Sequence, residues 1–480
     1  MEAKTAKELF GFLAKQIELF LKTHHEDHFA SHIKRRQTVS TPEGYRDEHI
    51  FRLGFTFSFP VHQIGINKGT LIRWTKGFNI PDAVGQDVCA LLQTEIDILR
   101  LPVRVAALVN DTVGTLMARS YSSPGKTGTL LGAIFGTGTN GAYVEKLSKI
   151  TKEMEGDFDK STGEMVVNTE WGSFDNDLNV LPNTKYDQIL DKESVNPGIQ
   201  MFEKRISGMF LGEILRTVLV DVMKSSSVAL FRDEDSSHND LHSTTTIPKS
   251  SALFEQWAVD SSILSFAESD NSTGLRTLRL EIEKSLGVSA PSFEDAQAVK
   301  IIAHAIAKRA ARLAGAAIGA IVLQTERLKV DTDSSQAAGP KSSAAILSDI
   351  KNLNISEAVS ATANKLADTA GITVNENEIV DIGVDGSLVE FYPGFESYMR
   401  EVLRVIDGIG PLGERKIRIG IAKDGSGVGA ALIALVATKM EKPETDYIGD
   451  LRRAAIMAGV NEENDEGLEF SPTEGRYVKS

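Results

Sequence analysis

The chain contains 480 residues, with 52 basic and 66 acidic side chains and a formal net charge of −14. This acidic balance argues against a scaffold for nucleic acid, which requires basic surface. With 41% hydrophobic and 25% charged residues, the composition is that of an ordinary globular protein. At roughly 150 residues per domain, the length predicts about two or three domains.

The cysteine content and the apolar runs indicate in which cellular compartment we expect the protein. The single cysteine, Cys89, cannot form an internal disulfide, so the sequence favours a reducing compartment, most simply the cytoplasm. The longest apolar run, residues 313–323, is well short of the ~20 residues that span a bilayer, and we expect a buried helix there. The N-terminus carries Glu2 and Glu8 and lacks the pattern of a secretion signal or transit peptide.

The first elements follow from hydrophobic periodicity. Apolar residues recur at helical spacing over residues 9–21, so we expect the chain to open in a helix, with Thr5 as the candidate cap. The polar, basic residues 24–48 are expected to form an exposed connection. From residue 51 onwards, strand-like apolar runs alternate with helical stretches, and this alternation predicts an α/β fold. The strand-like runs are residues 51–61, 101–110 and 129–144.

The second half of the chain continues this alternation. We expect long helices over residues 201–223 and 296–328, the second with Ala/Gly-rich turns that permit close helix contacts. Polar, Ser-rich segments near residues 224–251 and 331–341 are expected to be surface insertions. The last predicted elements are a strand-like run at 378–391, a strand at 416–427 and a helix at 427–440.

An Asn-Asp pair follows one predicted strand directly. Asn110 and Asp111 come just after the apolar run 103–109. Ligands of open α/β sheets gather beyond the carboxyl ends of strands, so this pair is well placed to meet a substrate. Taken alone, the pair would more often be a turn or a helix cap.

Gly-rich turns follow three predicted strands, at residues 136–141, 383–387 and 423–431. Glycines let backbone N–H groups approach and cradle phosphate oxygens, and Thr or Ser hydroxyls add further donors. One such turn is a weak signal, because a simple turn between strands is the common alternative. Three in one α/β chain point toward nucleotide binding.

Polar residues also stand inside apolar or aromatic surroundings: Ser58 in FTFSFP, Thr75 and Lys76 in RWTKGF, Glu170 in NTEWGSF and Glu203 in MFEKRISG. Sugars are bound by fixed carboxylates, amides and hydroxyls beside a hydrophobic wall. Taken singly, the two glutamates would rather be ordinary surface charges.

Taken in order, these strings resemble the hexokinase family of ATP-dependent sugar kinases, and most of all its fungal glucokinase branch. The resemblance extends from about residue 51 to residue 439. It is carried by LGFTFSFP, WTKGF, VNDTVGTLMA, GTGTNGAY, NTEWGSFDN, NPGIQMFEKRISGMFLGEILR, GVDGSLVEFYPGF and AKDGSGVGAAL.

The resemblance implies an actin-like ATPase (ribonuclease H-like) fold, with a small and a large domain around a sugar-binding cleft. Residues 1–112 would form the small domain, joined by the C-terminal helix near 428–442, and residues 113–427 would form the large domain. It further implies transfer of phosphate from ATP to the 6-hydroxyl of glucose or a related hexose, with Asp111 as general base. The implied sugar ligands are Ser58, Thr75, Lys76, Asn110, Asn140, Glu170 and Glu203.

The resemblance also implies a nucleotide side. Mg²⁺ is expected to come with ATP, on its phosphate oxygens, and we expect no dedicated protein metal site, nucleic-acid partner or membrane span. The residues expected to contact ATP phosphates are Gly136, Thr137 and Gly138. Those expected to line the adenosine pocket are Gly383, Asp385, Gly386, Ser387, Gly425, Ser426, Gly427 and Gly429.

One family motif is missing from the sequence. Relatives carry a strand–turn–strand of the type DLGGTNFR upstream, and its absence leads us to expect an N-terminally truncated chain with an incomplete small domain and an exposed strand edge. An active glucose kinase is therefore one hypothesis. A non-catalytic, hexokinase-like glucose sensor or truncated inactive isoform is the alternative, while an actin-like structural ATPase would leave the sugar motifs without a purpose.

Overall fold

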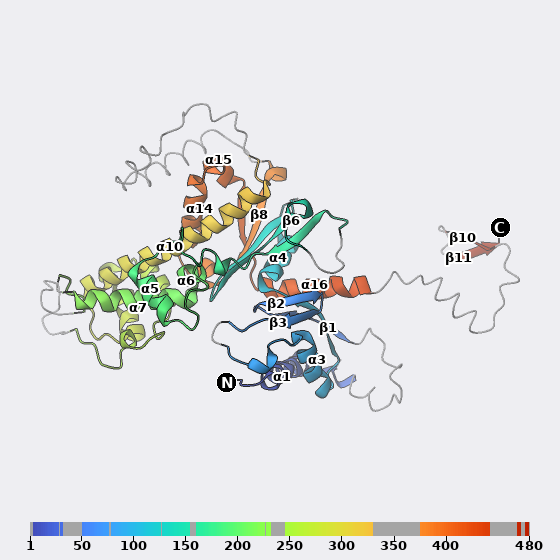
Figure 1. Ribbon diagram of the computed structural model, residues 1–480, viewed down its shortest axis with the longest axis horizontal. Coiled ribbons are helices and arrows are strands. Elements are labelled where there is room, and N and C mark those ends of the chain that lie inside the picture. The colour runs from blue at the N-terminus through green and yellow to red at the C-terminus, as the bar shows by residue number, and fades with distance from the viewer. Residues whose placement is uncertain are drawn as a thin grey trace.

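The computed structural model describes residues 3–27, 29–31, 50–75, 78–125, 127–153, 160–225, 227–231, 245–329, 375–441, 468–471 and 476–479. Its elements form two lobes, which meet at the helices α4 (Asp111–Ser122) and α16 (Gly425–Glu441) (Figure 1). We call the elements that precede α4 the N-terminal lobe, and the sheet and helices between α4 and α16 the large lobe.

The N-terminal lobe has a parallel pair of strands between helices. Its elements are α1 (Ala6–His24), β1 (Phe51–Thr56), β2 (Val61–Gly65), β3 (Lys68–Leu71), η3 (Pro81–Ala83), α3 (Val88–Ile98) and β4 (Val103–Val109). Phe10, Leu92 and Val105 belong to the core between the strands and the helices α1 and α3. The other face of β4 is lined by small residues such as Ala106, and α16 packs closely against it.

The strands β1 and β4 form a two-stranded parallel sheet. Within the described ranges they pair only with each other. Side chains satisfy part of the free edge of β4. Gln93 Oε1 accepts the Val105 N–H at 2.9 Å, and Gln93 Nε2 donates to the Val103 carbonyl at 3.1 Å. Gln93 thus takes the place of a neighbouring strand and keeps this buried backbone hydrogen-bonded.

The large lobe is built on a five-stranded sheet in the order β7-β6-β5-β8-β9. Its strands are β5 (Thr129–Phe135), β6 (Thr139–Lys146), β7 (Glu164–Asn168), β8 (Val380–Asp385) and β9 (Ile417–Ile421). The neighbours β5, β8 and β9 are parallel, whereas β6 and β7 are antiparallel to the strands beside them. The carboxyl ends of the three parallel strands therefore share one edge. The three predicted Gly-rich segments extend from it, although Gly383 lies inside β8 and residues 425–431 are the start of α16.

Helices complete the large lobe (Figure 1). They are α5 (Lys185–Glu193), α6 (Glu203–Ile206), α7 (Gly208–Lys224), α8 (Ser262–Ser269), α9 (Arg276–Glu281), α10 (Phe293–Thr325), α13 (Ser387–Phe391), α14 (Phe395–Val405) and α15 (Gly410–Arg415). Shorter turns are η4 (Leu147–Lys149), η5 (Trp171–Ser173), η6 (Ala252–Phe254), η7 (Thr273–Leu275), η8 (Ile282–Leu286) and η10 (Glu376–Glu378). In α10, a Cβ on Gly315 would lie 2.5 Å from the Met399 carbonyl oxygen, so the predicted close helix contact is confirmed.

Several sequence predictions can be compared with these elements. The opening helix and its Thr5 cap are confirmed, because Thr5 Oγ1 accepts the Glu8 N–H at 3.2 Å. The single helix predicted over 201–223 is wrong. Ser207 is extended between α6 and α7, and the next residue, Gly208, donates its N–H to the Gly136 carbonyl at 2.7 Å. That bond to the turn after β5 bends the chain there.

Half of the segment 224–251, all of 331–341 and most of the connection 24–48 lie outside the described residues. The run 378–391 is a strand only up to its middle, where β8 gives way to α13.

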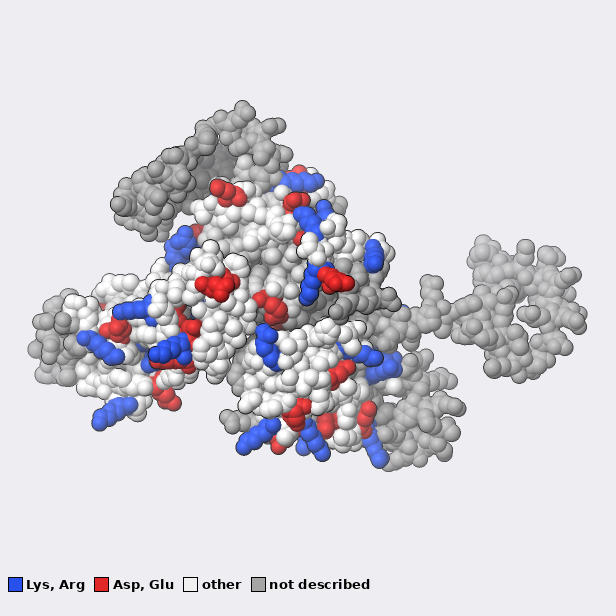
Figure 2. Space-filling view, viewed as in Figure 1, with Lys and Arg blue, Asp and Glu red and all other residues white. Residues whose placement is uncertain are grey.

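The two remaining strands form a separate hairpin-like pair near the C-terminus. β10 (Leu468–Ser471) and β11 (Arg476–Lys479) pair with each other in antiparallel fashion. Among the described residues, no helix combines the length and apolar character needed to cross a bilayer. On the face shown in Figure 2, acidic and basic side chains are interspersed over both lobes.

Candidate active site

A cavity of about 440 Å³ opens where the lobes meet, at the carboxyl ends of β5 and β8. Predicted residues from both lobes line it, which confirms that the chain brings these distant motifs together. The predicted residues in its lining are Ser58, Thr75, Asn110, Asp111, Gly136, Thr137, Gly138, Asn140, Glu170, Glu203, Asp385, Gly386, Ser387 and Ser426. Lys76 lies outside the described residues.

The Asn-Asp pair begins helix α4. Asn110 is the N-cap, and its Oδ1 accepts the Thr112 N–H at 3.0 Å and the Thr112 hydroxyl at 2.5 Å. Asp111 is the first helical residue, and its Oδ1 accepts the same N–H at 2.8 Å. The cap interpretation is therefore confirmed, and both residues also line the cavity. Capping fixes the direction of the helix, and its first turn presents a carboxylate to the cavity.

Hydrogen bonds organise the predicted sugar side. Asn140 Nδ2 donates to Asn168 Oδ1 at 2.9 Å and to Glu170 Oε1 at 3.0 Å, and Asn168 Nδ2 donates to Glu170 Oε1 at 2.7 Å. Glu203 Oε2 accepts the Thr139 N–H at 2.9 Å. Glu170 has a left-handed backbone (φ 49°), which is uncommon outside glycine and is maintained by its surroundings.

The packing of Trp171 supports the hydrogen-bonded residues Asn140, Asn168 and Glu170. It is buried, stacks on Phe135 with ring centroids 5.9 Å apart, and donates its indole N–H to Thr139 Oγ1 at 3.0 Å. Gly141 must be a glycine because a Cβ there would lie 2.6 Å from the Trp171 ring. Packing against Trp171 thus holds the turn that carries Asn140.

Sequence reasoning missed part of the lining. The residues not predicted are Thr56, Phe59, Pro60, Ile134, Thr139, Gly172 and Gln200. Gln200 is the most informative, because its amide can bind a hydroxyl and its Oε1 lies 3.2 Å from Ser173 Oγ. The sequence offered a clue, since Gln200 stands three residues before Glu203 in NPGIQMFEK.

The opposite side of the cavity is made of the Gly-rich turns. Gly386 has φ 112°, and a Cβ there would lie 2.5 Å from the Phe135 carbonyl oxygen, so the turn after β8 can approach the turn after β5 only with glycine. Beyond Thr137 and Ser387, a second cavity of about 370 Å³ continues between α8 and α13. It offers polar groups such as Ser261 and Ser265.

Asp385 joins this side to α16. Its Oδ1 accepts the Gly386 N–H at 2.7 Å, and its Oδ2 accepts the Gly425 N–H at 3.2 Å. Burial raises the pKa of the Asp385 carboxyl above its ordinary value, and the nearby charges of Asp424 and Glu390 add to this rise, while the two N–H groups oppose it.

Four predicted nucleotide residues, Gly383, Gly425, Gly427 and Gly429, are not among the residues that line either cavity. Gly383 lies inside β8, where a Cβ would lie 2.6 Å from Arg119 Cβ. At Gly429 a Cβ would lie 1.9 Å from the Gly114 carbonyl oxygen. These two glycines permit close packing of α4 on β8 and on α16.

Metal ligands are sparse. Within the described parts of the chain, no group of three or more His, Cys, Asp or Glu side chains is arranged to hold a metal ion. The cavity does contain the carboxylates of Asp111 and Asp385. Carboxylate oxygens suit Mg²⁺ that keeps most of its ligands from phosphate and water.

Comparisons with known proteins agree with this geometry. Two sequence profiles, both described as hexokinase, match residues 1–121 and 130–436. The chain is 54% identical to glucokinase of Aspergillus niger over 92% of its own length and 79% of that protein. It is 40% identical to glucokinase-1 of Saccharomyces cerevisiae over 91% of its own length and 76% of that protein.

A solved structure gives the fold. The hexokinase of Schistosoma mansoni complexed with glucose is 30% identical, with a TM-score of 0.65 over 91% of this chain and 76% of that one. The architecture is thus that of an actin-like ATPase with a phosphotransferase cavity between its lobes. The chain belongs to the hexokinase family and is an ATP-dependent kinase by descent.

Proposed function

We propose that the chain transfers the γ-phosphoryl group of ATP to the 6-hydroxyl of glucose, giving glucose 6-phosphate and ADP. The main support is one cavity in which Asp111, the sugar-side carboxylates and amides, and two Gly-rich turns face one another. Glucose as substrate is supported by the names of the two glucokinases and by the glucose-bound hexokinase described above.

In this proposal, Asp111 is the general base. Its carboxylate accepts the proton of the 6-hydroxyl as that oxygen attacks the γ-phosphorus and the bond to the β-phosphate oxygen breaks. The position of Asp111 in the first turn of α4 supports the role, because the helix cap leaves its side chain little freedom relative to the cavity.

The sugar is positioned by the residues opposite. Asn140, Glu170 and Glu203 offer carboxylate and amide groups that can bind neighbouring hydroxyls, and Ser58 and Thr75 add hydroxyl groups from the N-terminal lobe. Phosphoryl transfer depends on alignment and charge stabilisation more than on covalent participation of the protein. Ligands from both lobes therefore support a cavity that closes on the sugar.

ATP is proposed to bind along the Gly-rich turns. Its phosphates would meet the backbone N–H groups near Thr137 and Gly386, and its nucleoside would extend into the second cavity, past Ser387. Mg²⁺ bound to the phosphates would neutralise charge that develops during transfer. The carboxylates of Asp111 and Asp385 are the side chains of this cavity suited to hold it, directly or through water.

We also propose a cytoplasmic location and the division into a small domain, 1–112 with 428–442, and a large domain, 113–427. The location is supported by the single cysteine, Cys89, which is buried and whose pKa burial raises to about 12. Such a thiol is poorly reactive and forms no disulfide within the chain. The domain division is supported by the packing of α16 on β1 and β4.

The test is ADP formation by the chain with ATP, Mg²⁺ and glucose, compared with Asp111→Asn. The control is Asp407→Asn, a substitution of an exposed residue in the turn that follows α14. Glucose-dependent turnover that Asp111→Asn removes would support the proposal. Glucose-independent ATP consumption, or full turnover in Asp111→Asn, would contradict it.

Binding of glucose can be measured separately through tryptophan emission. Trp74 and Trp171 lie beside the sugar side, whereas Trp257 packs on Phe210 in the large lobe. Glucose should change the emission of the Trp257→Phe variant as it does that of the unaltered chain. A change in emission without turnover would favour a glucose-binding protein that is not catalytic.

A further inference from the structure

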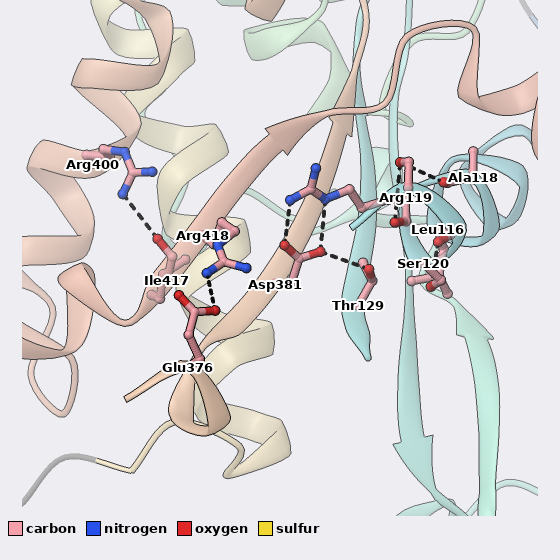
Figure 3. Close-up of polar contacts among 11 residues, drawn as sticks. Leu116, Ala118, Arg119, Ser120, Thr129, Glu376, Asp381, Arg400, Ile417 and Arg418 are labelled. Carbon is pink, nitrogen blue, oxygen red and sulfur yellow. Dashed lines mark hydrogen bonds and ion pairs between the residues drawn. The ribbon is translucent and has the colours of Figure 1, made fainter. Parts of the chain in front are cut away.

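A buried ion pair joins α4 to β8 (Figure 3). Arg119 donates from Nε to Asp381 Oδ2 at 2.9 Å and from Nη2 to Asp381 Oδ1 at 2.5 Å. The Thr129 hydroxyl, at the start of β5, donates to the same Oδ2 at 2.8 Å. Asp381 is 0% exposed and Arg119 is 8% exposed. The pair is bidentate and dry, the arrangement in which a guanidinium holds a carboxylate most firmly.

Two glycines make room for Arg119. A Cβ on Gly383 would lie 2.6 Å from Arg119 Cβ, and a Cβ on Gly420 would lie 2.3 Å from its Cζ. Gly383 is on β8 and Gly420 is on β9, so the arginine lies across both strands. Gly383, which the resemblance placed in the adenosine pocket, therefore makes room for the Arg119 side chain.

Most of the other buried residues of α4 are small, with Leu116 as the large exception. On β5, Gly132 lies so close to α4 that a Cβ would be 2.4 Å from the Leu116 backbone nitrogen, and on the other side Gly114 faces Gly429 of α16. Ridges of side chains that fit into grooves normally set the position of a helix on its neighbours. On these two faces glycines take the place of ridges, and the bonds of Arg119 add a directional contact to this close packing.

Arg119 and Asp111 are at opposite ends of α4. Arg119 is in the last turn and Asp111 in the first, about 12 Å apart along the axis at 1.5 Å per residue. The partner strand has the same arrangement, because Asp381 is near the start of β8 and Asp385, which lines the cavity, is at its end. The two hydrogen bonds between Arg119 and Asp381 thus link α4 to β8, the two elements whose other ends carry Asp111 and Asp385 into the cavity.

We propose that Arg119 is a positioning residue for phosphoryl transfer. Its bidentate pair with Asp381 fixes α4 along its axis on the large sheet, and so holds Asp111 at the carboxyl ends of β5 and β8. The inference rests on the proposed role of Asp111 as general base.

Two variants remove the fixed geometry in different ways. Arg119→Lys keeps the positive charge but loses the planar fork. The double variant Arg119→Met/Asp381→Leu removes both charges, which avoids a buried unpaired carboxylate and so preserves folding. In both, kcat should fall about 10²-fold, the order expected for a base displaced by ~1 Å, with KM for glucose changed less than about threefold.

The matched control is Arg400→Met/Glu414→Leu. This pair joins α14 to α15 through a 2.7 Å contact, and Glu414 is buried like Asp381, but the further ion pairs and hydrogen bonds of the two residues run to Glu396, Arg404 and Ile417 and not to α4. The control should lower Tm without lowering kcat at a temperature where all variants are folded by circular dichroism. If kcat falls in the control as it does in the Arg119 variants, the role of Arg119 is merely structural and the inference is wrong.

A double-mutant cycle with Asp111→Asn gives the second readout. If Arg119 acts through Asp111, adding Arg119→Lys to Asp111→Asn should lower the remaining kcat by less than about threefold. A further ~10²-fold loss on that background, or an unchanged kcat in Arg119→Lys alone, would overturn the inference. Absence of glucose-dependent turnover in the unaltered chain would overturn the proposed function, and this inference with it.

Discussion

Gly429→Ala should lower both the Tm and the kcat of the protein, although alanine is the better helix former. The added Cβ would lie 1.9 Å from the Gly114 carbonyl oxygen, whereas ordinary contacts begin at 3.4 Å, so α16 and α4 must separate by about 1.5 Å. The three nearest atoms that the Cβ would meet are backbone atoms of Gly114, which cannot rotate away.

The expected change in the free energy of unfolding is the difference between two opposing effects. Overpacking costs roughly 1–3 kcal/mol, and replacing a helical glycine with alanine returns up to about 1 kcal/mol. A net loss on the order of 1–2 kcal/mol lowers Tm by roughly 2–8 °C. Gly114 is on the first turns of α4, close to Asp111, so displacing the helix by ~1 Å should also reduce kcat on the order of 10²-fold.

Gly427→Ala is the matched control on the same helix. A Cβ there meets nothing within 4 Å, so the substitution should leave Tm unchanged or raise it. Thermal unfolding of both variants is followed by circular dichroism, and kcat by glucose-dependent ADP formation. Equal Tm and equal kcat in the two variants would refute the reasoning that the Gly114–Gly429 contact fixes the position of α4.

Three further outcomes are expected. Asp111→Asn should lower kcat about 10²–10⁴-fold with little change in KM for glucose, and a rate within tenfold of the unaltered chain would argue against a general base. Glu203→Gln should raise the Kd for glucose by about tenfold or more, measured by titration of tryptophan emission, because a charge-assisted hydrogen bond is lost. Burial alone would raise the pKa of Glu268, but hydrogen bonds from His304 and Tyr392 hold it below its ordinary value. Glu268 therefore stabilises the fold fully above about pH 4.5, and this contribution disappears as the pH falls. The Tm difference between the unaltered chain and Glu268→Gln should shrink below that pH, and a constant difference would contradict the assignment.

Much of the architecture follows from local patterns. The buried run before Asn110 predicts β4, the apolar run before Gly136 predicts β5, and the Ala/Gly-rich period predicts α10. These elements are confirmed because burial on one or both faces imposes a period that the sequence must carry. Most of the cavity lining is also among the residues that the family resemblance implied, whereas strand-end geometry alone pointed to Asn110, Asp111 and the Gly-rich turns.

Tertiary structure decided what each glycine and each charge does. Gly386 and Gly383 are neighbours in one motif, yet the first shapes the cavity and the second makes room for Arg119. The break between α6 and α7 depends on a bond to Gly136, far away in sequence.

The pairing of Arg119 with Asp381 joins residues 262 positions apart. A local pattern records which face of an element is buried, but not which distant atom it will meet there. Sequence therefore determined the elements, the family and most of the residues around the cavity, while the three-dimensional contacts determined how α4 is held and where its carboxylate lies.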